Sequence, residues 1–122
     1  MQFFTINDKQ KKLNLVQALI GREQEIHLYD VNIQNYETML TSLPQDEWPA
    51  VISAYKNTAI DQVPSDLHQL VTDYSFRDRL KALLATERLE RSKSVRVYEA
   101  IIAQLPETEI PSLIQEVLAA QQ

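Results

Sequence analysis

The stretch that decides the fold runs from Leu15 to Leu43 and reads LVQALIGREQEIHLYDVNIQNYETMLTSL. Within it, mostly apolar side chains recur at alternating steps of four and three residues, the spacing of a helix face that packs against another helix. We call this series the seam, and it predicts a long helix from about Asn7 to Ser42. The seam consists of Leu15, Leu19, Arg22, Ile26, Tyr29, Ile33, Tyr36, Leu40 and Leu43.

A second helix-period pattern predicts another long helix over about 76–104. Ser, Thr or Asp caps predict short helices over about 46–56, over about 65–74 and from Thr108 onward. No segment alternates apolar and polar residues for long enough to predict a strand. The chain has a single Gly, whereas the tight turns of sheets usually need several. The predicted fold class is all-α, a helical bundle of two long helices, each followed by short helices.

Two segments of the chain read alike at a constant offset. Residues 36–49 read YETMLTSLPQDEWP and residues 98–111 read YEAIIAQLPETEIP. The shared Leu-Pro-x-x-Glu-x-Pro favours an internal duplication over a chance likeness between amphipathic helices. We therefore expect a single domain over 1–122, with repeat units at about 7–57 and 76–121 and the helix at 65–74 connecting them.

Composition narrows the function classes. The 122 residues are 44% hydrophobic and carry a net charge of −5, which suits one folded domain and argues against nucleic acid as a partner. The absence of Cys excludes disulfides, thiolate metal sites and Cys nucleophiles. No apolar run approaches the roughly 20 residues that cross a bilayer, so no membrane contact is expected. Residues 1–8 lack the features of a signal peptide, so a cytoplasmic location is expected.

Polar residues interrupt the apolar faces of both long helices near their middles. Arg22 lies in the seam, and Glu87 and Arg91 fall on the packing face of the second helix. Since a buried charge must pair or reach water, one interpretation is a structural polar layer in which Arg22 pairs with Glu87, joined by Glu25 and Arg91. The other is a ligand-binding site formed by the same four residues, because bundles often place sites between their helices.

A metal site is a weaker alternative, with Glu23, His27 and Asp30 as its ligands. The run from Leu15 to Glu37 resembles ferritin-like carboxylate bundles, which bind metals through inward Glu residues and Glu-x-x-His pairs. Here the spacing is Glu-x-x-x-His, and the second repeat has Arg residues and a Leu where ligands would be needed. The sequence therefore predicts no metal and no other cofactor.

Positive charge is concentrated in residues 76–96, which hold seven Lys or Arg against three Asp or Glu. On a helical wheel, Arg77, Lys81, Arg88 and Arg91 form a basic stripe. Such a stripe is usually a solvated face, but it also fits docking to a protein with an acidic surface. Trp48 is predicted to pack beneath the long helices as a core residue, and the alternative is partner binding, because Trp is enriched at the centres of interfaces.

Catalytic signatures are missing from the sequence. Gly21 stands alone rather than in a phosphate-binding loop, and neither Gly-x-Ser-x-Gly nor His-Glu-x-x-His occurs. We expect a small interaction, adaptor or regulatory protein without enzymatic activity. Because the seam is longer than short helices can cover, a homodimer is expected. The alternative function is a ligand- or metal-binding helical bundle with its polar site midway along the long helices.

Overall fold

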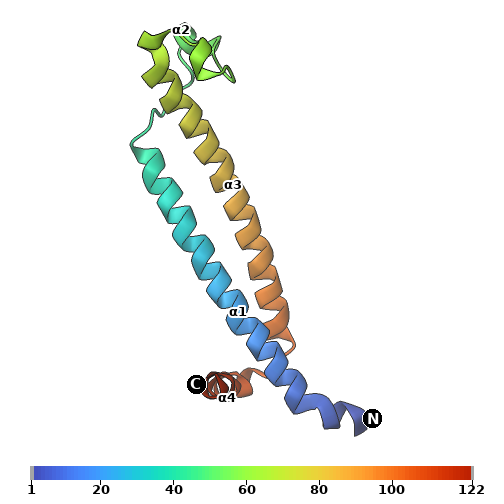
Figure 1. Ribbon diagram of the computed structural model, residues 1–122. Coiled ribbons are helices and arrows are strands. Elements are labelled where there is room, and N and C mark those ends of the chain that lie inside the picture. The colour runs from blue at the N-terminus through green and yellow to red at the C-terminus, as the bar shows by residue number, and fades with distance from the viewer. Residues whose placement is uncertain (1, 122) are drawn as a thin grey trace. The chain divides into compact units, whose positions relative to one another are not determined.

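The computed structural model describes residues 2–121, and for residues 2–8 the course of the backbone alone. The described residues form helices and no strand, which confirms the predicted all-α class. None of these helices is both long and apolar enough to span a membrane. The elements are α1 (Gln2–Thr41), α2 (Ala50–Ser53), η1 (Ile60–Gln62), η2 (Ser65–Leu67), α3 (His68–Ala103), η3 (Glu107–Glu109) and α4 (Ile110–Ala120), where η marks a 3-10 helix (Figure 1).

Both long helices stop just before a Leu-Pro pair. α1 ends two residues before Leu43-Pro44, and α3 ends two residues before Leu105-Pro106. A proline disfavours the helical conformation of the residue before it, so neither helix can continue through its pair. After α1, the Gln45 side-chain nitrogen donates to the carbonyl oxygens of Leu40 at 2.8 Å and Leu43 at 2.7 Å. These bonds satisfy carbonyls that a helix end leaves free.

Several helix boundaries differ from their predictions, and the start of the last helix is one of them, since Thr108 lies in η3 and Glu109 is the N-cap residue of α4. The short helix expected over 65–74 is not separate, because η2 runs directly into α3 at His68 and no Gly or Pro follows to interrupt it. The helix expected over 46–56 shrinks to the four residues of α2. Asp46 does not cap it, since its side chain is bound by Tyr74 of α3 instead.

Contacts divide the chain into two units, and each combines a part of α1 with a part of α3. Unit 1 comprises residues 1–30 and 90–122, and unit 2 comprises residues 31–89. In each unit the two helix segments run antiparallel (Figure 1). These units do not follow the predicted repeat boundaries at 7–57 and 76–121. The internal duplication and the two-long-helix bundle remain predictions.

The core of unit 1 joins three helices. Pro111 lies in the first turn of α4, where its missing N–H is tolerated, and α4 then directs one apolar face inward. Burying each aliphatic side chain contributes about 1.5–3 kcal/mol. The buried residues are Val16 and Leu19 of α1, Ile101 of α3, Leu105, and Leu113 and Val117 of α4.

The core of unit 2 explains why so short a helix as α2 exists. A four-residue helix is far below the length that is stable alone in water. Ile52 of α2 is completely buried, and it packs with Val63, Val71 and Tyr74. Tertiary burial therefore holds α2 in place and brings the segment 44–63 against the beginning of α3.

Candidate functional site

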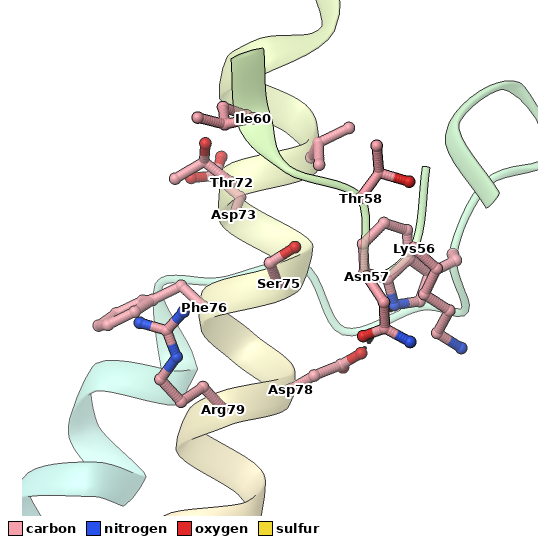
Figure 2. A pocket seen from close by; sticks show the side chains of 12 residues that line it. Lys56, Asn57, Thr58, Ile60, Thr72, Asp73, Ser75, Phe76, Asp78 and Arg79 are labelled. Carbon is pink, nitrogen blue, oxygen red and sulfur yellow. Dashed lines mark hydrogen bonds between the residues drawn. The ribbon is translucent and has the colours of Figure 1, made fainter. Parts of the chain in front are cut away.

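A groove of about 650 Å³ lies along the N-terminal half of α3 in unit 2 (Figure 2). We call it the Trp48 groove. Residues of α3 supply one wall, and Trp48 with the segment 56–60 supplies the other. Its lining combines apolar, charged and hydrogen-bonding side chains, namely Trp48, Ile60, Val71 and Phe76, then Lys56, Asp73, Asp78 and Arg79, and finally Asn57, Thr58, Thr72 and Ser75.

Asn57 turns the chain so that the segment 58–60 can reach α3. Its φ of 64° lies in the left-handed region, which Asn adopts more easily than most residues. The backbone N–H of Thr58 donates to the carbonyl of Tyr55 at 3.0 Å and closes the turn. The second wall of the Trp48 groove therefore depends on a local backbone conformation that the residue type favours.

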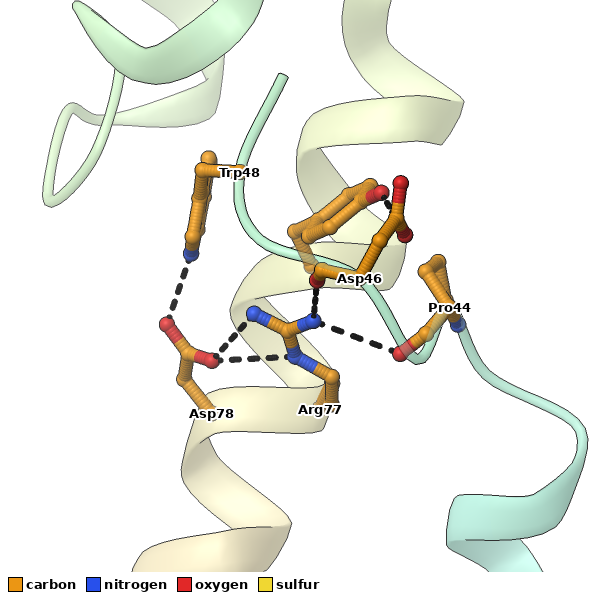
Figure 3. A network of polar contacts seen from close by, with 6 residues as sticks. Pro44, Asp46, Trp48, Arg77 and Asp78 are labelled. Atoms are coloured by element: carbon orange, nitrogen blue, oxygen red, sulfur yellow. Dashed lines mark hydrogen bonds and ion pairs between the residues drawn. The ribbon is translucent and has the colours of Figure 1, made fainter.

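Arg77 fixes the loop between α1 and α2 onto α3 (Figure 3). The residue is 5% exposed. Its Nη1 donates to the carbonyl oxygens of Pro44, at 3.3 Å, and Asp46. Its Nε and Nη2 donate to Oδ1 of Asp78 at 3.2 and 3.1 Å. One guanidinium thus binds two loop carbonyls and one carboxylate, a use of several donors that suits the planar fork of Arg.

Two aromatic side chains complete this arrangement. Trp48 Nε1 donates to Oδ2 of Asp78 at 2.8 Å, and the Tyr74 hydroxyl donates to Oδ1 of Asp46 at 2.6 Å. The Trp48 and Tyr74 ring centroids are 5.4 Å apart, and the Arg77 guanidinium carbon is 4.7 Å from the Tyr74 centroid. These are distances of aromatic and cation–π contacts. We call the set the Arg77 cluster: Pro44, Asp46, Trp48, Tyr74, Arg77 and Asp78.

The hydrogen bonds of the Arg77 cluster shift three pKa values. The bond from Tyr74 lowers the pKa of Asp46, and the same bond raises the pKa of Tyr74. Burial alone would raise the pKa of Asp78, but hydrogen bonds from Trp48 and Arg77 outweigh it and leave that pKa lowered. None of these shifts moves a pKa toward 7, as general acid–base catalysis at neutral pH requires.

The polar groups of the Arg77 cluster bind one another. Across the described part of the chain, every buried side-chain nitrogen or oxygen has a hydrogen-bond partner. An unsatisfied buried group would cost about 1–3 kcal/mol, so this completeness stabilises unit 2. The cluster therefore holds the loop 44–48 in place and shapes the Trp48 groove.

The predicted polar residues Arg22 and Glu25 meet in unit 1. Arg22 Nη1 donates to Oε2 of Glu25 at 3.0 Å, and the Tyr29 hydroxyl donates to Oε1 at 3.1 Å. Ser94 of α3, which is 2% exposed, donates its hydroxyl to Oε2 at 3.2 Å. Three donors from the chain itself thus occupy the Glu25 carboxylate.

Glu87 and Arg91 have other partners than those predicted. Glu87 accepts a hydrogen bond from Asn32 within unit 2 at 3.4 Å, whereas the prediction paired it with Arg22. Arg91 pairs with Asp30 within unit 1 at 2.5 Å. Coiled-coil spacing placed Glu87 and Arg91 on the face of α3 that faces α1. It did not predict which residues of α1 they contact. Their predicted ligand-binding role stays a prediction.

Arg77 does not contribute to an exposed basic stripe, and this corrects its predicted role in partner binding. The helical wheel placed it beside Lys81, but the loop 44–48 covers that part of α3. Arg88 is exposed and lies 3.4 Å from Glu37, Lys81 is exposed, and Trp48 is half-buried in the loop before α2. Partner binding by these three residues stays a prediction.

The alternative metal ligands are not gathered into a site. Among the described residues, no three His, Cys, Asp or Glu side chains lie in a group that could hold a metal ion. Asp30 is paired with Arg91, and Glu23 and His27 are exposed. The spacing of Glu23 and His27 along one helix is therefore not matched by ligands from another element.

The sequence pattern does not indicate the Arg77 cluster. It predicts Asp46 as a helix cap and predicts no role for Tyr74. The partners of the cluster lie about thirty residues apart, beyond the reach of cap and periodicity rules. The available signal was the unusual density of Pro, Asp and Trp in residues 44–49, which favours a structured loop over a helix.

No protein family, curated protein sequence or solved structure matches the chain.

Proposed function

We propose that the chain is a non-enzymatic interaction protein that works as a homodimer. The observation that carries this proposal is an apolar surface on the helix pair of unit 2, partly exposed in the single chain. We call it the Met39 surface. It consists of Tyr36, Met39 and Leu43 of the α1 side and Phe76 and Leu83 of α3.

The hydrogen bond from Asn32 to Glu87 marks the register of the two helices at one end of this surface. In an antiparallel pair, moving forward along one helix corresponds to moving backward along the other. Residues separated by steps of three or four lie on one face of a helix. Residues at such steps from Asn32 on one helix and from Glu87 on the other therefore lie on the same side of the helix pair. Tyr36, Met39 and Leu43 follow Asn32 at such steps along α1 and the segment after it, and Leu83 and Phe76 precede Glu87 at such steps along α3.

Exposure separates this surface from the core. Met39 and Leu83 are each 42% exposed, whereas Leu80 is 3% and Leu84 is 6% exposed. The other three residues of the Met39 surface are half-buried. In a pair of helices, each helix buries only a narrow strip of the other's surface. The apolar side chains beside that strip are buried only when another element or another chain packs on them.

The opposite side of the same helix pair is charged. Arg88 Nη2 lies 3.4 Å from Oε1 of Glu37, and Lys81 is exposed on that side of α3. The ion pair thus lies on one side of the helix pair and the apolar residues of the Met39 surface on the other, where the exposed Arg79 follows Phe76 by three residues. Such a difference between sides favours docking through the Met39 surface.

A second copy of the chain fits this surface. Two antiparallel helix pairs that face each other through apolar sides form a four-helix bundle, a common and stable arrangement. A two-fold axis would place the same residues on both sides of the interface, so one apolar surface suffices. A binding role rather than a catalytic one is further supported by the Arg77 cluster, whose polar groups are engaged with one another.

The test is the mass of the protein in solution. Light scattering after size-exclusion chromatography, at about 100 µM protein and thus above the micromolar constants of weak interfaces, should give twice the chain mass of 14.1 kDa. The variants Met39→Asp and Leu83→Asp should each give the single-chain mass, because a charge in an apolar interface is strongly unfavourable.

The matched control is Val51→Asp. Val51 is 63% exposed on α2 and lies outside the Met39 surface, so this variant should keep the mass of the wild type. A monomeric wild type, or dimers that persist in both Met39→Asp and Leu83→Asp, would contradict the proposal.

A further inference from the structure

The charges that line the Trp48 groove are not equally available to a ligand. The Asp78 carboxylate is bound by Trp48 and Arg77, and the Asp73 carboxylate accepts from Gln69 at 2.8 Å. Lys56 and Arg79 are exposed and belong to none of the ion pairs between described residues, although the charge of Lys56 helps to lower the pKa of Asp78. The cations without an ion pair are therefore Lys56 and Arg79, whereas Asp73 keeps its negative charge because its hydrogen-bond partner Gln69 is neutral.

These cations flank the groove. Figure 2 shows Arg79 and Lys56 on opposite sides of Ser75 and Asp78. The Lys56 ammonium lies 5.6 Å from the Trp48 ring centroid, a cation–π distance. An extended ligand can thus meet one positive charge toward each end of the groove.

The groove also offers apolar contact. Val71 is buried at its wall, Phe76 is half-buried, and Ile60 is 46% exposed. The Trp48 ring is fixed by its bond to Asp78 and by packing on Tyr74, so it loses little side-chain freedom when a ligand binds. A pre-organised aromatic ring next to cations is typical of the residues that dominate binding energy at interfaces.

We infer that the Trp48 groove binds a short segment of a partner protein in which carboxylates flank a bulky apolar residue. The apolar side chain contacts Trp48 and Ile60, and the carboxylates pair with Lys56 and Arg79. The net charge of −5 does not prevent this, because charges beyond about 8 Å are largely screened at physiological salt. This inference rests on the proposed interaction role but not on the dimer.

A random twelve-residue peptide library displayed on phage tests this specificity without assuming a sequence. Selection on the wild-type protein should enrich peptides with Asp or Glu on both sides of Leu, Ile or Phe. Peptides free of Trp are then synthesised. Because Trp48 is the single Trp of the chain, its fluorescence reports binding at the groove itself.

Lys81 supplies a matched control for Arg79. Both are exposed cations of α3, but Lys81 lies on the side of the helix away from the groove. The double variant Lys56→Glu/Arg79→Glu should weaken peptide binding by about tenfold or more, whereas Lys81→Glu should change it less than about twofold. Circular dichroism checks that each variant folds, and Arg79→Gln replaces the double variant if that one does not.

The outcomes separate this inference from the dimer. Binding of acidic peptides by the monomeric Met39→Asp variant would support the groove even if the proposed dimer fails. Enrichment of neutral or basic peptides, no enrichment at all, or equal losses in the Arg79 and Lys81 variants would overturn it. The last result would instead favour the basic stripe predicted from the sequence.

Discussion

Arg77 illustrates how one side chain can decide the position of a loop. It is nearly buried, yet its charge is balanced by Asp78 and its donors reach two carbonyls of the segment 44–46. A buried charge is tolerated when all of its hydrogen-bonding groups have partners. Removing Arg77 would leave the loop carbonyls and the Asp78 carboxylate without their donor. The loop that carries Trp48 therefore depends on this residue more than on any local propensity.

Replacing Arg77 with Met should lower the free energy of unfolding by about 2–4 kcal/mol, because the loop carbonyls and Asp78 lose their donors while the aliphatic volume is kept. Urea unfolding followed by circular dichroism measures the change. Arg79→Met is the control, since Arg79 is exposed, and it should stay within about 0.5 kcal/mol of the wild type. Equal stability of the two variants would show that the bonds of Arg77 contribute little.

The Arg77 cluster should also make stability depend on pH. The pKa values of Asp46 and Asp78 are lowered in the folded chain, so their stabilising effect is complete above the ordinary carboxyl pKa of about 4 and is lost as pH falls through their folded values. The pKa of Tyr74 is raised, so its contribution is lost above about pH 10. Thermal unfolding from pH 2 to 11 measures both effects.

The variant Asp78→Asn provides the comparison for the acid side. It should be less stable than the wild type at pH 7 and should lose less stability on acidification, since one of the two titrating carboxylates is gone. Parallel pH profiles for both proteins would argue against this role of Asp78.

At the level of whole elements, periodicity predicted α1 well, because the seam reports a physical requirement. Each of its nine positions is half-buried or buried in the structure. Periodicity could not predict the beginning of α3 or the size of α2, since both depend on tertiary contacts. Tyr74 is buried by the loop 44–48, and Ile52 is buried by residues that come later in the chain.

Gly21 marks a weak point within α1. A Cβ added there would meet no atom within 4 Å, and the residue has no positive φ. Gly21→Ala should therefore raise the free energy of unfolding by about 0.5–1 kcal/mol, because alanine restricts the unfolded chain without a clash. Denaturant unfolding measures the change in the free energy of unfolding. A destabilised variant would show that another part of the molecule packs closely against the backbone at Gly21.

Glu25 and Ser94 couple α1 to α3 in unit 1. Glu25→Leu should destabilise the protein by about 1–2 kcal/mol, because the buried Ser94 hydroxyl loses its acceptor. Adding Ser94→Ala should recover most of that loss, since removing both partners leaves nothing unsatisfied. A double-mutant cycle in urea measures the coupling. Additive losses would mean that the two residues act separately.

At the level of the whole molecule, the division into two units could not be read from the sequence. The repeated Leu-Pro segments suggested boundaries after each long helix, but contacts form between segments that are far apart in the chain. Each unit has roughly 60 residues, a size at which burial is limited and stability marginal. A partner that covers the Met39 surface would add the burial that each chain lacks by itself.

We expect the stability of the protein to rise with its concentration. If folding and dimer formation are coupled, raising the concentration about a hundredfold favours the folded state by about 2.7 kcal per mole of dimer, or about 1.4 kcal per mole of chain, which corresponds to a thermal midpoint several degrees higher. Scanning calorimetry of the wild type over that range measures the shift. Met39→Asp should show a lower midpoint that does not move with concentration, and Val51→Asp should behave like the wild type. A wild-type midpoint independent of concentration would mean that the Met39 surface is left open in the folded protein, and the dimer would then have to be abandoned.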